Sequence, residues 1–385
     1  MDAVLNYIKK FSVTEWLFFL VIMSFNSWWP IWNNSAAAPL CYGSILILLA
    51  KTFNSNRHSL INNGAVTFLL LLYFVVLQTA NTIHLSSIFI VVAYMLSTTL
   101  NANESKNVIK LLTDYLALSI IISLPFWIVH EFVYQLPVYQ IMDISSWKGN
   151  DGQYYLNYFF FIAVEGIEAH RFYSLFDEPG VLGTLSAFLL WANQYNFKDK
   201  RCLIIFIGSL FTFSMAFYIL SVFGWICSTK IKLSSLIIRI SLFLLVCLVL
   251  ATFLSDNLAF QQSILYRIAN LEETGVHSRT SYEFNLLWSD FIVSPSVFFG
   301  LGSGAVDELG GNTSYRFFVL EYGVIGLILL ISAYYCNIRK TNYLALMTLF
   351  IFILSFLQRP ALFTAANIFL FTCIVRNFET KNQAV

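Results

Sequence analysis

The chain has 385 residues, of which 58% are hydrophobic and only 11% are charged, and its formal net charge is +1 at pH 7. A soluble domain carries about a quarter charged residues, so this composition excludes an ordinary soluble protein. Apolar runs long enough to cross a hydrocarbon core of about 30 Å recur along the chain. The sequence predicts an all-α polytopic integral membrane protein, organised as a single membrane domain over 1–385.

About twelve transmembrane helices are expected, because every backbone group inside a bilayer must be satisfied within its own segment. The first apolar run has no small-residue cleavage site after it, which indicates a signal anchor. Two of the expected helices are short. The predicted spans are 13–31, 36–50, 64–80, 83–100, 109–130, 179–196, 202–213, 215–228, 233–254, 315–337, 341–357 and 361–375.

The positive residues set the orientation, since Lys and Arg concentrate in cytoplasmic loops. Lys9 and Lys10 precede the first span, and Arg376 and Lys381 follow the last. We therefore expect both termini in the cytoplasm of a bacterial inner membrane. The stretch 202–228 has basic clusters at both ends, so we expect two short helices or a re-entrant hairpin that breaks near Thr212–Ser214. A single long helix is the alternative.

Two large periplasmic loops follow from this topology, at 131–178 and 255–314. Loops of this length in a compact protein are usually functional. The outward face is rich in acidic residues, and all of its cations except Lys148 are arginines, whose planar fork suits phosphate and carboxylate oxygens. These arginines are Arg171, Arg267, Arg279, Arg316 and Arg359. The alternative interpretation is that each arginine forms an ion pair with a neighbouring carboxylate.

The first loop ends in the run Arg171-Phe-Tyr-Ser-Leu-Phe-Asp-Glu-Pro-Gly180, directly before an apolar helix. Pro179 suits the first helical position, and Asp177 and Glu178 lie at the positive end of that helix. A helix cap explains the two carboxylates. It does not explain the arginine and the two aromatic residues just upstream.

The second loop predicts an amphipathic helix over 278–291, lying against the membrane. Its polar side carries His277, Arg279 and Glu283, and its apolar side carries Phe284, Leu287 and Trp288. The next segment, Phe298–Gly304, is a glycine-dense turn at which backbone can approach a ligand closely.

The next span opens with Asn312-Thr-Ser-Tyr-Arg316 and continues with Glu321-Tyr-Gly-Val-Ile-Gly326. Glu321 lies more than one turn inside an apolar helix, where an ionisable residue is a functional candidate by default. A structural pair with an arginine is the alternative.

No HxxxH, HExxH or DxD pattern is present, so we expect no protein-bound metal. Walker and GxGxxG loops are also missing, which argues against ATP-driven and dinucleotide chemistry, and we expect no cofactor. The six cysteines fall in or beside apolar segments, which indicates a packing role.

These segments together resemble the O-antigen polymerase/ligase superfamily of membrane glycosyltransferases. Three matches occur in the expected order: the run from Arg171 to Gly180, Arg279 upstream of Trp288 and the glycine turn, and Asn312 followed by Glu321 to Gly326. Thr212-Phe-Ser-Met resembles the family's Thr-x-Ser-Arg element, with Met215 in place of the arginine. The match covers about 171–326, and the first five spans match only in hydropathy.

The resemblance implies a GT-C-like fold and transfer of a glycan from undecaprenyl pyrophosphate. It implies a lipid-linked oligosaccharide as substrate, membrane lipid around the chain, and a chain-length regulator and a flippase as partners, with no nucleic acid. The arginines Arg171, Arg267, Arg279 and Arg316, together with Asn312, are the expected substrate contacts. Glu178, His277 and Glu321 are the expected acid, base or orienting groups.

Gly311 stands where ligases of the superfamily carry a histidine, so the resemblance favours a polymerase over a ligase. A flippase or other transporter is the alternative from a different class. Such a protein would place ionisable residues near the bilayer midplane, whereas here they concentrate in the outer loops and first helical turns. A membrane protein whose loops bind a partner is a third reading, and it leaves the outward arginines unexplained.

Overall fold

The computed structural model describes residues 6–25, 37–55, 63–78, 85–143, 154–165, 171–228, 282–305, 315–358 and 362–381, with a few single residues between 238 and 266. The structure is 73% helical. Contacts divide it into two compact units. Unit 1 comprises Met1–Phe25, Ser35–Leu111 and Glu272–Val385, and unit 2 comprises Asn26–Asn34 and Leu112–Leu271.

The described helices occupy the predicted spans, and one further helix occupies the predicted amphipathic segment. They are α2 (Val13–Phe25), α4 (Ala37–Asn54), α5 (Gly64–Leu70) with the π-helix η2 (Leu71–Leu77), α6 (Leu85–Ser97), α7 (Ala102–Phe132), α9 (Pro179–Ala192), α10 (Lys200–Leu210), α11 (Met215–Cys227), α16 (Tyr282–Ile292), the 3-10 turn η5 (Pro295–Val297), α17 (Tyr315–Cys336), α18 (Tyr343–Gln358) and α19 (Ala365–Lys381). The predicted span 233–254 lies outside the described residues apart from single positions.

Three of these helices, α4, α7 and α17, are long and apolar enough to cross a membrane. Several shorter apolar helices accompany them, among them α9, α11 and α18. The structure therefore confirms the coarse prediction of a mostly helical chain built from apolar helices.

Local signals in the sequence explain where several helices begin. At the start of α2, Ser12 and Glu15 form a reciprocal capping box: the Ser12 N–H donates to Glu15 Oε2 at 2.6 Å, and the Glu15 N–H donates to Ser12 Oγ at 3.3 Å. Asn101 and Glu104 make the same pair of bonds at the start of α7. Such boxes satisfy two of the N–H groups that a helix start leaves without partners. Asn107 then donates to Glu15 at 2.7 Å and joins the two helix starts.

Unit 1 is a bundle in which α2 packs against α4 and α19, and α6 packs against α19. Aromatic contacts fill its interior, such as the edge-to-face pair of Phe18 and Phe369, whose ring centroids lie 4.7 Å apart. A buried polar cluster joins the C-terminal ends of α6 and α17 to the middle of α19. In it, Asn337 Nδ2 donates to Ser97 Oγ at 2.8 Å and to Thr372 Oγ1 at 2.6 Å. The predicted topology assigns these ends of α6 and α17 to the cytoplasmic side.

Unit 2 contains the short helix pair α10 and α11, which the sequence predicted with a break near Thr212–Ser214. Residues 211–214 leave the helical conformation, and Phe213 has a φ of 45°. Ser214 is the N-cap of α11, where its Oγ accepts from the Phe217 N–H at 3.5 Å. The two-helix prediction is confirmed, and the alternative of a single long helix is wrong.

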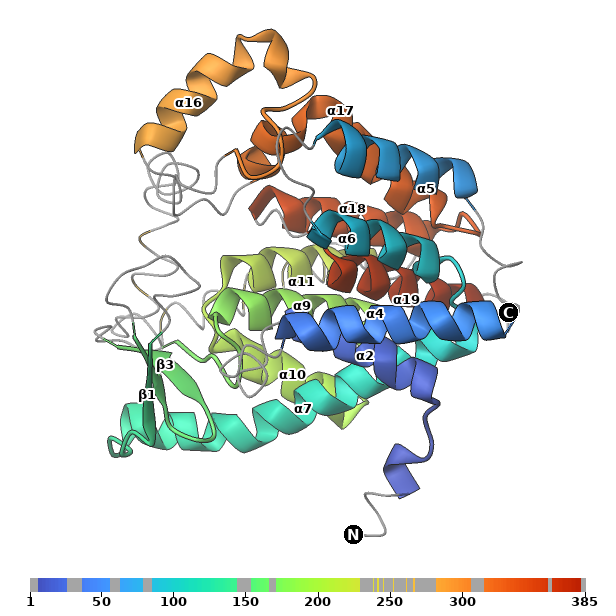
Figure 1. Ribbon diagram of the computed structural model, residues 1–385. Coiled ribbons are helices and arrows are strands. Elements are labelled where there is room, and N and C mark those ends of the chain that lie inside the picture. Colours follow the sequence, from blue (N-terminus) through green and yellow to red (C-terminus); the bar gives the residue numbers. More distant parts are fainter. Residues whose placement is uncertain are drawn as a thin grey trace. The chain divides into compact units, whose positions relative to one another are not determined.

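A small antiparallel sheet lies in the segment 131–178, which the sequence predicts as the first periplasmic loop, and departs from the all-α prediction. It is built from β1 (Gln140–Asp143), β2 (Tyr154–Asn157) and β3 (Ile162–Val164), in the order β1-β2-β3. Strands of three or four residues are too short to show a clear alternation of apolar and polar residues. The sheet follows the end of α7, where Phe126 stacks on Phe160 with ring centroids 4.0 Å apart. In Figure 1 it lies beside the end of α7.

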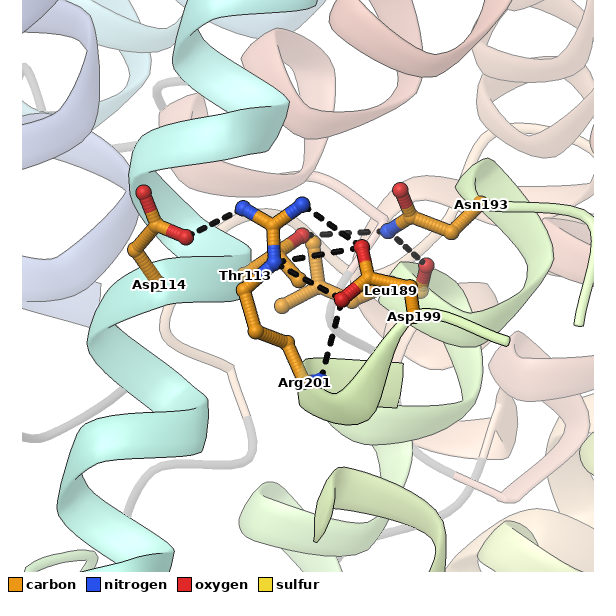
Figure 2. A network of polar contacts seen from close by, with 6 residues as sticks. All are labelled: Thr113, Asp114, Leu189, Asn193, Asp199 and Arg201. Atoms are coloured by element: carbon orange, nitrogen blue, oxygen red, sulfur yellow. Dashed lines mark hydrogen bonds and ion pairs between the residues drawn. The ribbon is translucent and has the colours of Figure 1, made fainter. Parts of the chain in front are cut away.

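A network of polar contacts around Arg201 joins α7, α9 and α10 in unit 2, as Figure 2 shows. Arg201 donates from Nε and Nη2 to the carboxylate of Asp199, with the shortest bond at 2.6 Å, and from Nη1 to Asp114 of α7. Asn193, at the end of α9, donates to Thr113 Oγ1 at 3.0 Å. One guanidinium therefore joins α7 to the start of α10, and these bonds hold the pKa of Asp199 below its usual value.

Arg201→Ala should lower the stability of the folded chain by roughly 1–2 kcal/mol, because it leaves two carboxylates without their cation at a partly exposed site. The measurement is thermal unfolding of the purified full chain in detergent, with Lys200→Ala, an exposed neighbour, as the matched control.

The difference between wild type and Arg201→Ala should also depend on pH. A carboxylate whose pKa is lowered by folding stabilises the protein above its unfolded pKa, about 3.9 for Asp. This stabilisation is lost as the pH falls through the folded value. The difference should therefore be full at pH 7 and shrink below about pH 4, and a difference that grew on acidification would contradict the assignment.

Candidate functional site

Helix α17 is interrupted at Gly323, inside the motif from Glu321 to Gly326. Gly323 has φ 65° and ψ −179°, with helical residues on both sides. A positive φ of this kind is accessible to glycine and strained for other residues. The break frees backbone carbonyl and N–H groups within one of the most apolar helices of the chain.

The glycine segment, Phe298–Gly304, supplies partners for these groups. The Leu301 N–H donates to the Leu320 carbonyl at 2.8 Å, and the Gly302 N–H donates to the Glu321 carbonyl at 3.0 Å. In the opposite direction, the Ile325 N–H donates to the Phe298 carbonyl at 3.1 Å. The segment therefore completes the hydrogen bonding that the helix break interrupts, as buried backbone requires.

Two glycines permit the two backbones to approach this closely. Gly300 has a φ of 86°, and a Cβ atom there would overlap the Glu321 carbonyl. A Cβ atom on Gly323 would lie 2.6 Å from the Gly300 nitrogen. The glycines were predicted to let backbone approach a ligand closely, but in the structure they let it approach the backbone of α17.

Two polar side chains from η2 complete the contact. Tyr73 donates from its hydroxyl to the Tyr322 carbonyl at 2.6 Å and lies 3.1 Å from the Phe299 carbonyl. Gln78 Nε2 donates to the same Phe299 carbonyl at 2.6 Å. Sequence reasoning missed both residues. The signal that could have found them is a hydrogen-bonding side chain inside an otherwise apolar run.

Glu321 is 6% exposed, and its Oε1 accepts from the Gly304 N–H at 2.8 Å. It borders a cavity of about 280 Å³, half of whose lining residues are aromatic, with hydroxyl-bearing residues among the others. Residues lining this cavity include Tyr42, Ser86, Phe318, Tyr322, Phe363 and Thr364. A buried carboxylate thus lies at a helix break, beside a space large enough for a small chemical group.

Arg316, in the first turn of α17, lies against α16. Its guanidinium carbon is 5.1 Å from the centroid of the Trp288 ring, and Nη1 is 3.4 Å from Asn285 Oδ1. The apolar side of α16 is buried through Phe284 and Phe291, which pack on Val319 and Leu320. The predicted amphipathic helix is present over 282–292, and α17 rather than lipid covers these two aromatic side chains.

Arg171, in unit 2, binds the turn between α10 and α11. Its Nε donates to the Thr212 carbonyl and its Nη2 to the Phe213 carbonyl, both at 2.8 Å. The neighbouring Phe172 N–H donates to the Phe211 carbonyl at 3.0 Å. The structure therefore brings together two segments that the resemblance singled out separately. The positive guanidinium suits carbonyls at the negative end of a helix.

Glu178 is the N-cap residue of α9, with an extended backbone and no capping bond from its side chain. Pro179 occupies the first turn of that helix, as predicted. The Asp177 carbonyl accepts from the Tyr155 hydroxyl of β2 at 2.6 Å. The sheet thus holds the chain just before the helix begins.

The candidate residues fall into three groups. Arg171 and Glu178 belong to unit 2, and Arg316 and Glu321 belong to unit 1. The other candidates lie outside the described residues, namely Arg267, His277, Arg279 and Asn312. Within the described part of the chain, no three His, Cys, Asp or Glu side chains are grouped as metal ligands would be.

No protein-family model matches the chain, and no curated protein or solved structure matches it significantly.

Gly300→Ala should destabilise the chain by about 2 kcal/mol or more, because the new Cβ atom meets backbone at a positive φ. The matched control is Gly43→Ala in α4, where a Cβ atom would have nothing within 4 Å. Thermal unfolding of both variants in detergent is the measurement. Equal melting temperatures for the two variants would show that the glycine segment does not dock on α17.

Proposed function

We propose that this protein is an O-antigen polymerase. It transfers a growing glycan from undecaprenyl pyrophosphate onto the terminal sugar of the next lipid-linked repeat unit, at the periplasmic face of the bacterial inner membrane. The observation that carries the proposal is the buried Glu321 carboxylate, placed at the break of an apolar helix and next to a cavity. An ionisable group in such a helix is expensive to keep without a function.

The chemistry of glycan transfer needs a base for the acceptor hydroxyl and positive charge for the leaving group. Glu321, Glu178 and His277 are the proposed acid, base or orienting groups. Arginines suit the pyrophosphate, on which negative charge develops as the glycosidic bond breaks. Arg171, Arg267 and Arg279 are assigned to the pyrophosphate or glycan, with Asn312 and Arg316 as further substrate contacts. The donor itself supplies the energy, so the reaction needs no nucleotide.

The wider architecture is part of the same proposal. It comprises about twelve transmembrane helices in a GT-C-like arrangement, with both termini in the cytoplasm and the loops 131–178 and 255–314 in the periplasm. The chain-length regulator and the flippase are the proposed protein partners.

Arg171 has a structural role whatever its role in catalysis, since Nε and Nη2 hold the carbonyls of the α10–α11 turn. Its loss would disturb that turn as well as any substrate contact. Glu321→Gln is the sharper variant, because a glutamine keeps one oxygen for the Gly304 N–H and replaces the other with a neutral amide group, so that the negative charge is lost at nearly constant shape.

Deletion of the gene in its host should leave lipopolysaccharide with core plus a single repeat unit, and should remove the ladder of longer chains from a gel. Complementation with the wild type should restore the ladder. Bare core with polymer still attached to undecaprenyl pyrophosphate would instead indicate a ligase. Bare core without polymer would indicate a flippase, and an unchanged ladder would contradict all three functions.

Glu321→Gln, Arg171→Ala and Arg279→Ala should each abolish the ladder in the deletion strain while the protein still reaches the membrane. The matched control is Asp290→Asn, an exposed carboxylate of α16, which should support a full ladder. Immunoblots of membrane fractions measure abundance. Normal chain lengths with Glu321→Gln would remove that residue from the mechanism, and normal lengths with both arginine variants would remove the family assignment.

A further inference from the structure

The glycine segment lies in the loop that the sequence places in the periplasm, yet it contacts the interior of apolar helices. Its partner on α17 is the break at Gly323, which is about 10–12 Å along the helix from Tyr315 at 1.5 Å per residue. Its partner on η2 is Tyr73, in the middle of the predicted span 64–80. Two independent helices therefore place the segment at the same depth below the expected outer surface.

The backbone N–H groups of this segment are hydrogen-bonded within the protein more completely than is usual for a loop. Every N–H from Val297 to Ala305 has an acceptor in the protein. Four of these acceptors lie in other elements: the carbonyls of Leu320, Glu321 and Gln78, and the Glu321 carboxylate. A loop in water has no need of this, whereas irregular backbone at membrane depth is tolerated only when protein satisfies it.

The side chains that the segment presents outward are apolar. Phe298 is 57% exposed, Phe299 is 61% exposed and Leu301 is 39% exposed. No charged residue occurs between Asp290 and Asp307, which makes this the uncharged part of an otherwise acidic loop. Apolar surface left in water lacks the roughly 25 cal/mol per Å² of stabilisation that its removal from water would provide. Phenylalanine side chains in contact with hydrocarbon carry no such free-energy penalty.

We propose that residues 295–305 form a re-entrant segment, which dips into the outer leaflet beside α17 and places Phe298 and Phe299 among the lipid acyl chains. The partner of this surface is the bilayer itself. Depth, backbone satisfaction and the absence of charge point to the same occupant, and the inference requires only that α17 crosses the membrane. It does not depend on the proposed enzymatic activity.

The segment has a consequence for Glu321. Its carboxylate accepts from the Gly304 N–H at the end of the re-entrant segment. A segment anchored in lipid on one side and in α17 on the other holds that N–H in place, so lipid contact and carboxylate position are coupled through a few residues of backbone.

The test uses a nitroxide label at Phe299→Cys in the full chain, with the six native cysteines replaced and the protein reconstituted into lipid vesicles. Collision rates are measured with oxygen, which concentrates in hydrocarbon, and with a water-soluble nickel chelate. Asp290→Cys, on the charged end of α16, is the aqueous control. Phe68→Cys, a 61% exposed residue of α5 in a predicted span, is the lipid control.

At position 299, as at 68, oxygen collisions should exceed nickel collisions several-fold, with the opposite ratio at 290. A label at 299 that collides with nickel as often as the label at 290 would overturn the proposal. Exclusion of both reagents would also overturn it, because the surface would then be covered by protein.

A second measurement needs no substitution and covers the case in which the cysteine-free chain does not fold. Hydroxyl-radical footprinting of the wild-type protein in vesicles should leave Phe298 and Phe299 unmodified, while Tyr134, which is 68% exposed in the first outer loop, is oxidised. Oxidation of the two phenylalanines to the same extent as Tyr134 would place the segment in water and overturn the proposal.

Discussion

The hydrogen bonds across the break in α17 are the contact on which the rest of unit 1 depends. A helix that breaks in an apolar stretch leaves N–H and C=O groups that must find partners within the protein, since each unsatisfied group costs several kcal/mol in hydrocarbon. Here the partners come from two places in the sequence, the glycine segment and Tyr73, while Gln78 binds the Phe299 carbonyl of the glycine segment. The same few bonds connect α17, η2 and the glycine segment.

Unit 2 meets the same requirement in another way. The turn between α10 and α11 exposes carbonyls at 212 and 213, and the guanidinium of Arg171 binds both of them. Gly183 lets α11 approach α9 closely, since a Cβ atom there would lie 2.8 Å from the Ser214 Cβ. A charged donor suits this turn because carbonyls at a helix end carry partial negative charge. In α17 the partners are neutral backbone groups of the glycine segment and a tyrosine hydroxyl, which cost less to bury than an arginine.

Hydropathy was enough to locate the helices, because a span is a property of contiguous residues. The predicted 315–337 became Tyr315–Cys336, and 215–228 became Met215–Cys227. The break at Gly323 was not predicted, because a single glycine in an apolar helix is usually tolerated. What turns this glycine into a break is a segment about twenty residues upstream, and no local pattern reveals that pairing. The three short strands were missed because three or four residues are too few to show a clear alternation of apolar and polar side chains.

The sequence marked Glu321 and the glycine segment as two separate candidates, and the structure joins them. Burying a carboxylate in an apolar helix is costly unless hydrogen bonds satisfy its oxygens. A backbone N–H aimed at Oε1 offsets part of that penalty and fixes the direction of the second oxygen. A base that must accept a proton from a substrate hydroxyl needs such fixed geometry before the substrate arrives. The break in α17 is therefore connected to the proposed chemistry. The glycine segment hydrogen-bonds the backbone groups that the break exposes, and the same segment orients the Glu321 carboxylate beside the cavity.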